Sequence, residues 1–325
     1  MPLARAIDSL FDAETVGHTA ALLIMKRGSP IVERYAPGIN ERTPLPGWSL
    51  GQCVTATMIG QLVSDGRLRM DETAPVPAWQ RPGDPRGEIT LRQLLQMRSG
   101  LRHKETAEVA RHSDRDRMLF LDGRDDMAAY AEAQPLEAQA GRVFEPSAAT
   151  GVILADLAAR VLTDSGDPAA RRRVVGDYLR TRVLDPIGMT GTRLTFDRAG
   201  TLVGSSMISA PAGDWARLGE FLRHHGSVKG AQVLPHRWVA FMRNPSPRNP
   251  AYGAGVWLNG TPPEGEPPFW PGGPKDLFGC RGEHGQYVIG SPGQLLTVVR
   301  LGHTSTEQQA ALHARMRELL ALFPG

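Results

Sequence analysis

Residues 47–60 read GWSLGQCVTATMIG, and this stretch decides how the rest of the chain is interpreted. Within it and just after it, apolar residues recur at helical spacing, namely Val54, Met58 and Leu62, with Ile59 and Val63 beside them. This spacing predicts a buried α-helix with Ser49 at its N-terminal end. At that end the helix dipole would favour an oxyanion next to the serine hydroxyl. A simpler role for Ser49 is an N-cap that satisfies one backbone N–H of the helix.

The stretch from Thr43 to Gly60 resembles the nucleophile segment of the serine β-lactamase-related family, which includes class C β-lactamases and penicillin-binding proteins. The pattern resembles above all the 6-aminohexanoate-dimer hydrolase and esterase branch. Further matches follow in the same order, at residues 89–101, 203–207, 214–219, 252–259 and 285–288. The resemblance therefore spans roughly residues 20 to 320.

This resemblance implies an α/β (α+β), β-lactamase/transpeptidase-like fold. In that fold an antiparallel sheet is flanked by N- and C-terminal helices, and a mostly helical lobe is inserted. We expect a single domain, residues 1–325, with the α/β lobe at approximately 1–65 and 245–325 and the helical lobe at approximately 66–244.

The periodicity of the sequence agrees with this architecture. Residues 20–26 and 31–35 flank a Gly-Ser-Pro turn and predict a β-hairpin. Strands are predicted at 254–258, 286–290 and 295–301, followed by a closing helix at 307–322. We expect the N-terminal and C-terminal strands to share one sheet.

Two of the family's catalytic positions carry residues that cannot transfer a proton. The family activates its serine with a lysine three residues later, and that position holds Gln52, which titrates at no useful pH. The family's second element supplies a tyrosine, and the aligned position here is Pro146, followed by Ser147. Proline offers no side-chain donor.

The third position differs in charge. The family places a cation on the strand that borders the cleft, whereas this chain reads Gly282-Glu283-His284-Gly285, with a carboxylate at the cation's position. Successive strand residues face opposite sides, so a Glu283 that enters the cleft would leave His284 pointing away. A bulge at Gly282 or Gly285 could re-aim both side chains.

With all three positions changed, we expect the cleft to serve non-hydrolytic acid/base chemistry on a small molecule. Glu283 would be the general base or acid with His284 or Ser49 assisting, in an isomerase, cyclase or lyase of a specialised biosynthetic pathway. Two alternatives stay open. One is a serine esterase or amidase that uses Ser49, and the other is a non-catalytic protein that binds a ligand or a partner. The residues expected to line the cleft are Gln52, Pro146, Ser147, Glu105, Gly282 and Gly285.

Other segments of the sequence allow predictions about individual residues. Relatives place pocket-lining residues where this chain has Glu105 and His103, although a solvated loop is the preferred reading of residues 102–106. Cys53 is interpreted as a small, inert, buried hydrophobe, and its distance from Cys280 does not follow from the sequence. Phe269 and Trp270, in a Pro/Gly-rich loop at 260–274, either rim the cleft or pin the loop to the body.

Composition limits the possible partners and compartments. The 37 basic and 34 acidic residues nearly balance and no basic stretch comes with a recognition motif, so nucleic-acid binding is not expected. No apolar run approaches the roughly 20 residues that a membrane span needs. The N-terminus carries acidic residues where a secretory signal would need an uninterrupted apolar core. The chain also has only two cysteines, and together these features favour the reducing cytoplasm. The nine histidines lack metal-ligand spacing, so we expect no metal or other cofactor and a small molecule as the ligand.

Overall fold

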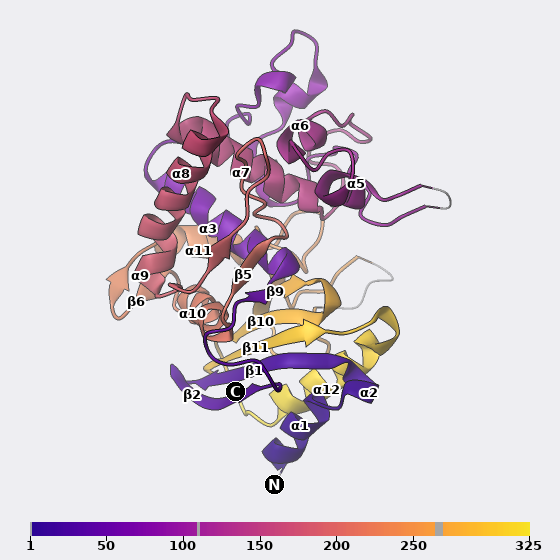
Figure 1. The fold of residues 1–325 in the computed structure, drawn as a ribbon, viewed down its shortest axis with the longest axis vertical. Coiled ribbons are helices and arrows are strands. Elements are labelled where there is room, and N and C mark those ends of the chain that lie inside the picture. The colour runs from indigo at the N-terminus through magenta and orange to yellow at the C-terminus, as the bar shows by residue number, and fades with distance from the viewer. Residues whose placement is uncertain (1, 109–110, 264–268) are drawn as a thin grey trace.

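The computed structural model describes residues 2–108, 111–263 and 269–325. Its centre is a six-stranded antiparallel sheet in the order β2-β1-β11-β10-β9-β8 (Figure 1). The strands are β1 (His18–Lys26), β2 (Ser29–Tyr35), β8 (Trp257–Leu258), β9 (Phe278–Gly282), β10 (Gln286–Ser291) and β11 (Leu296–His303). Because β1 pairs with β11 along its length, the N-terminal hairpin and the C-terminal strands share one sheet, as the sequence predicts.

One predicted strand is shorter than expected. The sequence predicts a strand over residues 254–258, whereas only Trp257 and Leu258 pair with β9. The chain turns at Gly255, where φ is 76°, and a Cβ at this glycine would lie 2.5 Å from the Cβ of Ala56. The backbone therefore turns so that it can pass close to a helix instead of extending along the sheet edge.

Helices cover both faces of the sheet. The helices α1 (Pro2–Leu10), α2 (Ala13–Val16) and α12 (Gln309–Ala321) lie on one face, where Leu312 and Met316 pack with Leu22 and Ile24 of β1. The helix α10 (Ala212–Arg223) packs on the other face against β1, β10 and β11. Burial on both faces explains why β1 reads as an almost continuous apolar run instead of an alternating one.

The part of the chain between β2 and β8 is mostly helical and lies beyond one edge of the sheet (Figure 1). Its helices are α3 (Gly51–Ser64), α4 (Leu91–Leu95), α5 (Asp114–Phe120), α6 (Met127–Glu132), α7 (Ala148–Leu162), α8 (Pro168–Leu179), α9 (Asp185–Ile187) and α11 (His236–Met242). Short strands accompany them, namely β3 (Leu45–Pro46), β4 (Arg193–Leu194), β5 (Ile208–Ala210), β6 (Ser227–Val228) and β7 (Ala231–Gln232). Single helical turns are η1 (Trp48–Leu50), η2 (Pro77–Trp79), η3 (Pro85–Glu88), η4 (Arg180–Leu184), η5 (Glu283–Gly285) and η6 (Thr306–Gln308).

The helix α3 is the buried helix that the apolar spacing predicts. Eleven of its 14 residues are buried, so it is a core helix and not a surface helix with one apolar face. It packs against α7, and the preceding turn η1 contacts β9. The start of α3 is thereby fixed at the end of a sheet strand, where the two structural layers meet.

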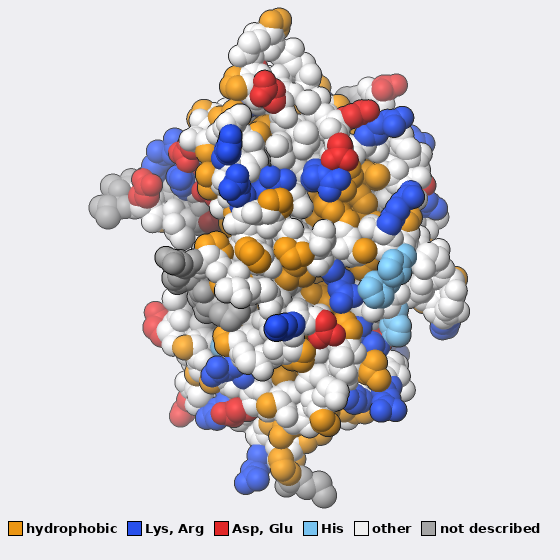
Figure 2. Space-filling model, turned by 180° about the vertical axis from the view of Figure 1, so that it is seen from behind, with side chains coloured by type: hydrophobic (Ala, Val, Ile, Leu, Met, Phe, Trp, Pro, Cys, Tyr) orange, Lys and Arg blue, Asp and Glu red, His pale blue; other side chains and the backbone are white. Residues whose placement is uncertain are grey.

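Charged and apolar side chains are mixed on the surface. On the face seen in Figure 2, Lys and Arg side chains are interspersed with Asp and Glu side chains and with small apolar areas. Within the described residues, no helix has both the length and the apolar character to cross a membrane.

Candidate functional site

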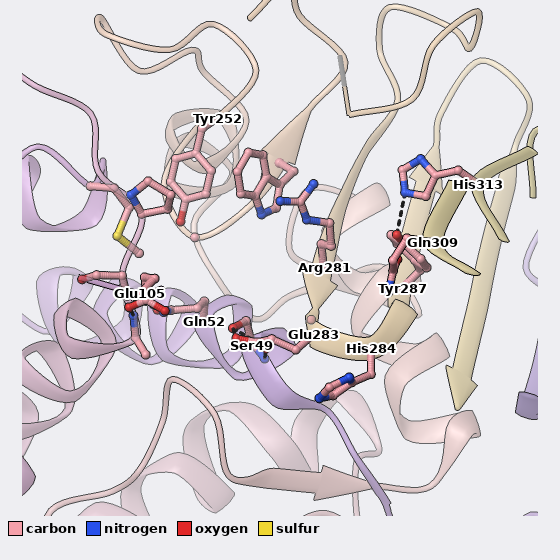
Figure 3. Close-up of a pocket in the computed structure, with 17 residues that line it drawn as sticks. Ser49, Gln52, Glu105, Tyr252, Arg281, Glu283, His284, Tyr287, Gln309 and His313 are labelled. Carbon is pink, nitrogen blue, oxygen red and sulfur yellow. Dashed lines mark hydrogen bonds between the residues drawn. The ribbon is translucent and has the colours of Figure 1, made fainter. Parts of the chain in front are cut away.

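A pocket of about 450 Å³ opens beside the N-terminal end of α3 (Figure 3). Eight of the nine site residues predicted from the sequence line it, namely Ser49, Gln52, Glu105, Pro146, Ser147, Gly282, Glu283 and His284. The ninth, Gly285, does not; it packs towards Leu312 and Arg300 inside the protein. Segments far apart in the sequence therefore meet at one cavity.

Ser49 and Glu283 contact each other directly at the pocket wall. The Ser49 hydroxyl donates at 2.9 Å to Oε2 and lies 3.0 Å from Oε1 of Glu283, and the Ser49 backbone N–H donates to Oε2 at 3.1 Å. Ser49 lies in η1, and α3 has Leu50 as its N-cap residue, without a side-chain capping bond. The N-cap interpretation of Ser49 is therefore wrong, because its hydroxyl donates a hydrogen bond to the Glu283 carboxylate and does not cap a backbone N–H of the helix.

A glycine makes this contact possible. A Cβ on Gly282 would lie 2.3 Å from the Gly47 carbonyl oxygen and 3.1 Å from the Ser49 nitrogen. Only a residue without a side chain lets the end of β9 come this close to η1. The carboxylate of the next residue then reaches the serine.

His284 lies apart from this pair. The strand alternation expected for Glu283 and His284 does not apply, because both residues belong to the turn η5, in which His284 has a φ of 61°. The His284 ring stacks on the His303 ring with 4.4 Å between the ring centroids. It meets the Trp48 ring edge-on, with 5.1 Å between the centroids. Burial and the neighbouring His303 lower the pKa of His284, which keeps the ring neutral near pH 7.

Two arginines that the sequence reading missed support Glu283. Arg115, at the start of α5, places Nη1 3.5 Å from Oε1 of Glu283, with both side chains about a quarter exposed. Arg300 of β11 is fully buried and donates to the Gly285 carbonyl at 2.9 Å and to the His284 carbonyl at 3.3 Å. One arginine thus pairs with the carboxylate, while the other holds the turn that carries it.

Neither arginine stands out in the sequence. Arg115 follows a segment read as a solvated loop, and Arg300 lies in an apolar strand pattern. The one signal that could have marked Arg300 is its charge inside an apolar strand pattern. Guanidinium groups are seldom buried without hydrogen-bond partners, so this charge predicts that acceptor groups lie nearby.

The residues at the positions where the resemblance implies a lysine and a tyrosine make structural contacts. The Gln52 side-chain amide donates to the Ser147 carbonyl at 3.1 Å. The Ser147 hydroxyl accepts from the Thr150 N–H at 3.1 Å and caps α7, while Pro146 forms part of the wall. Tyr252, which the sequence does not mark as a site residue, also lines the pocket, and burial raises the pKa of its phenol.

Glu105 is a second carboxylate in the pocket. Its Oε1 accepts the Ala148 backbone N–H at 2.8 Å, and burial raises the pKa of Glu105 to about 7. The nearby His103 is 3% exposed and contacts Ser147 Oγ and the Ala131 carbonyl, and burial lowers its pKa to about 4. The solvated-loop interpretation is therefore wrong for both residues, because His103 is buried, Glu105 is half-buried in the pocket wall, and both are hydrogen-bonded.

The opposite end of the pocket is lined by residues of the sheet and of α12. Arg281 lies with its guanidinium 4.3 Å from the centre of the Trp257 ring. The Tyr287 hydroxyl and His313 Nε2 share a hydrogen bond of 2.6 Å, drawn dashed in Figure 3. Figure 3 places Tyr287 and His313 on the far side of Glu283 from Gln52 and Glu105. The pocket is therefore elongated, with its two carboxylates towards the helical side.

Cys53 and Cys280 form a disulfide. The interpretation of Cys53 as an inert hydrophobe is wrong, since its sulfur is bonded to β9. Cys53 lies four residues after Ser49, and Cys280 lies three residues before Glu283. The bond therefore ties together the two elements that bring the serine and the carboxylate into contact.

The aromatic pair at 269–270 does not rim the pocket. Phe269 and Trp270 are 2% and 1% exposed and pack in the apolar cluster under α12, which pins the end of this loop to the body. Residues 264–268 of the same loop lie outside the described residues. No cluster of His, Cys, Asp or Glu suited to a metal ion occurs in the ranges that the structure describes.

The sequence and the fold were compared with known proteins. The sequence profile of the family described as Beta-lactamase matches residues 7–323. A sequence comparison with curated proteins gave no match.

Many solved structures share the fold. A candidate 6-aminohexanoate-dimer hydrolase from Bacillus anthracis has a TM-score of 0.76 at 19% identity, over 98% of this chain and 83% of that one. EstCE1, a hydrolase with promiscuous acyltransferase activity, has a TM-score of 0.73 at 17% identity over 98% of both chains. A β-lactamase from Mycobacterium bovis has a TM-score of 0.66 at 18% identity, over 98% and 97%. At such identities the likeness shows the fold alone.

Proposed function

The chain belongs to the Beta-lactamase family, and we propose that it has exchanged serine hydrolysis for proton transfer on a small organic molecule bound in the pocket. Glu283 takes a proton from the ligand as the general base, and Glu105 returns one as the general acid. A proton removed at one atom and delivered at another gives an isomerisation, a cyclisation or an elimination. No oxidant and no group donor is required.

The contact between Ser49 and Glu283 carries this proposal. In serine hydrolysis the hydroxyl attacks, and backbone N–H groups at the site stabilise the negative oxygen that forms. Here both the Ser49 hydroxyl and its N–H donate to the same carboxylate. The serine therefore orients Glu283, and the N–H that an acyl intermediate would need is already engaged.

The two carboxylates lie in different environments. Glu283 accepts two hydrogen bonds from Ser49 and lies 3.5 Å from the Arg115 guanidinium. Glu105 is half-buried, accepts one backbone N–H and has a pKa of about 7, so a large fraction carries a proton at neutral pH. An acid and base pair needs one carboxyl group that holds a proton, and burial gives Glu105 that role.

A serine hydrolase is the second candidate. Its support is the 2.9 Å distance between the Ser49 hydroxyl and Glu283, which lies within reach for direct proton removal from the serine. The hydrolase descriptions of the structural relatives point the same way. Against it stand Gln52 and Pro146, since neither supplies the base or the proton shuttle that the family uses.

Solvent-deuterium exchange tests the proposal. The protein is incubated in D₂O with a panel of small compounds that carry an acidic C–H next to a carbonyl, and deuterium uptake is followed by mass. We expect uptake with the wild type and a loss of about 100-fold or more in Glu283→Gln, because a positioned general base contributes about that much. Glu88→Gln, at an exposed glutamate, is the matched control. Uptake that is equal in the wild type and Glu283→Gln, or absent from both across the panel, would contradict the proposal.

A further inference from the structure

We infer that Ser49 and Arg115 form a binding slot for a small carboxylate, which the side chain of Glu283 fills from within. The slot has three kinds of donor: the Ser49 backbone N–H, the Ser49 hydroxyl and the Arg115 guanidinium. The slot would bind a carboxylate whether or not the protein catalyses a reaction on it.

The donors match a carboxylate in number and placement. One oxygen of Glu283 accepts both the Ser49 N–H and the hydroxyl, at 3.1 and 2.9 Å, and the other faces the Arg115 Nη1 at 3.5 Å. Hydrogen bonds to an ionised acceptor are stronger than those between neutral groups. A backbone N–H, a hydroxyl and a cation that converge on one anion make a site selective for carboxylates and similar oxyanions.

Elements other than Glu283 hold the donors in place. The Ser49 N–H is fixed by η1, against which Gly282 is packed, and the Cys53–Cys280 disulfide ties α3 to β9. The Arg115 backbone N–H donates to the Lys104 carbonyl at 3.2 Å, and its guanidinium contacts Asp116 at 3.4 Å. Removal of the Glu283 carboxylate should therefore leave the slot standing.

The size of the ligand follows from the side chain. Replacing glutamate by alanine removes a methylene and a carboxylate, which together are acetate less one hydrogen atom. Acetate should therefore fit the space left by Glu283→Ala. Since the slot opens on the 450 Å³ pocket, the organic part of a larger carboxylate can extend along the pocket wall. In the wild type such acids must displace Glu283, so they should act as competitors of the resident side chain.

Thermal unfolding of Glu283→Ala with sodium acetate tests the slot, with sodium chloride at equal ionic strength as the salt control. We expect a saturable rise in Tm of about 2 °C, the size of shift that a ligand at roughly ten times its Kd produces in a chain of this length. The wild type and Glu88→Ala should respond to acetate as they do to chloride. Glu283→Gln should behave like the wild type, because its amide still fills the slot. The double variant Glu283→Ala/Arg115→Gln should lose most of the acetate response.

An acetate response in the wild type equal to that of Glu283→Ala, or one unchanged by Arg115→Gln, would overturn the inference. If Glu283→Ala does not fold, Glu283→Ser is used in its place. This variant is refolded with and without acetate, and recovery of folded protein only with acetate supports the slot. Failure of both variants to fold with acetate present counts against it. Because acetate binding needs no catalysis, absence of deuterium exchange would reject the proposed function and leave the slot intact.

Discussion

Single residues decide the chemistry of this pocket. The carboxylate of Glu283 stands where the resemblance places a cation, and it takes the hydrogen bonds of Ser49. Gln52 and Pro146 occupy positions where the resemblance implies a lysine and a tyrosine; Gln52 makes a hydrogen bond to the Ser147 carbonyl and Pro146 lines the pocket. Under the proposed function, the change of charge at position 283 is the important one, because it gives the serine a new partner.

Glu105 should make the stability of the protein depend on pH. Its pKa is about 7 in the folded protein, against 4.5 for a free glutamate. Between these values the unfolded chain has lost the proton while the folded chain keeps it, so stability falls as pH rises from about 4.5 to about 7. The total change is at most about 3 kcal/mol. Urea unfolding of the wild type and Glu105→Gln at several pH values measures it, and the variant should have a flatter profile across this window. Equal slopes in the two proteins would contradict the assignment.

Gly282 should not tolerate a side chain. In Gly282→Ala the new methyl group would meet the Gly47 carbonyl, so β9 must move away from η1 and carry Glu283 with it. We expect a loss of about 1–3 kcal/mol in the free energy of unfolding, as for overpacking elsewhere. Gly166→Ala serves as a control, since nothing lies within 4 Å of a Cβ at this position. A variant as stable as the wild type would show that the close approach is not needed.

At the scale of elements, the site depends on how β9, η5 and α3 are joined. Arg300 links η5 to β1 as well, since it donates to the hydroxyl of Thr19 at 3.0 Å. Burial lowers the pKa of Arg300 to about 10, so it keeps its charge at neutral pH. Its guanidinium donates to the Gly285 carbonyl and adds a second hydrogen bond to the His284 carbonyl, which also accepts the Thr304 N–H at 3.0 Å.

The disulfide should stabilise the junction of α3 and β9. Joining residues 227 positions apart restricts the unfolded chain, and native disulfides contribute about 2–4 kcal/mol. The double variant Cys53→Ala/Cys280→Ala should unfold at a lower Tm, and a reducing agent should lower the Tm of the wild type but not of the variant. Alkylation under non-reducing conditions, read by intact mass, reports the bond itself. Two freely alkylated cysteines in the native protein would contradict it.

Across the whole molecule, the pocket forms where the sheet meets the helical region, and Arg115 bridges the two. Because Arg115 and Glu283 are each about a quarter exposed, solvent screens the pair, and its net contribution to stability should be about 0–1 kcal/mol. We therefore expect Arg115→Gln to change the Tm by little while it reduces acetate binding in the Glu283→Ala background. Arg117→Gln, two residues further along α5, is the control. A large loss of stability in Arg115→Gln would assign this arginine a structural role instead.

The sequence predicts the shared sheet, the buried helix α3 and most of the pocket wall, because motif order and apolar spacing are local signals. It does not predict that Glu283 leaves the strand for a turn, since this depends on Gly285 and on Arg300 from another strand. The contacts of Arg115 and the meeting of Cys53 with Cys280 are also missed. Each of these contacts joins segments that are far apart in the sequence, and local sequence patterns do not show which distant segments meet.

The most direct test of the account is whether Ser49 still acts as a nucleophile. Intact-protein mass is measured after incubation with a penicillin, a p-nitrophenyl ester and a fluorophosphonate, for the wild type and Ser49→Ala, with an active serine hydrolase of the family as the positive control. The account predicts no adduct that depends on Ser49 under conditions that label the control. An adduct present in the wild type and lost in Ser49→Ala would contradict it, and the hydrolase reading would then hold.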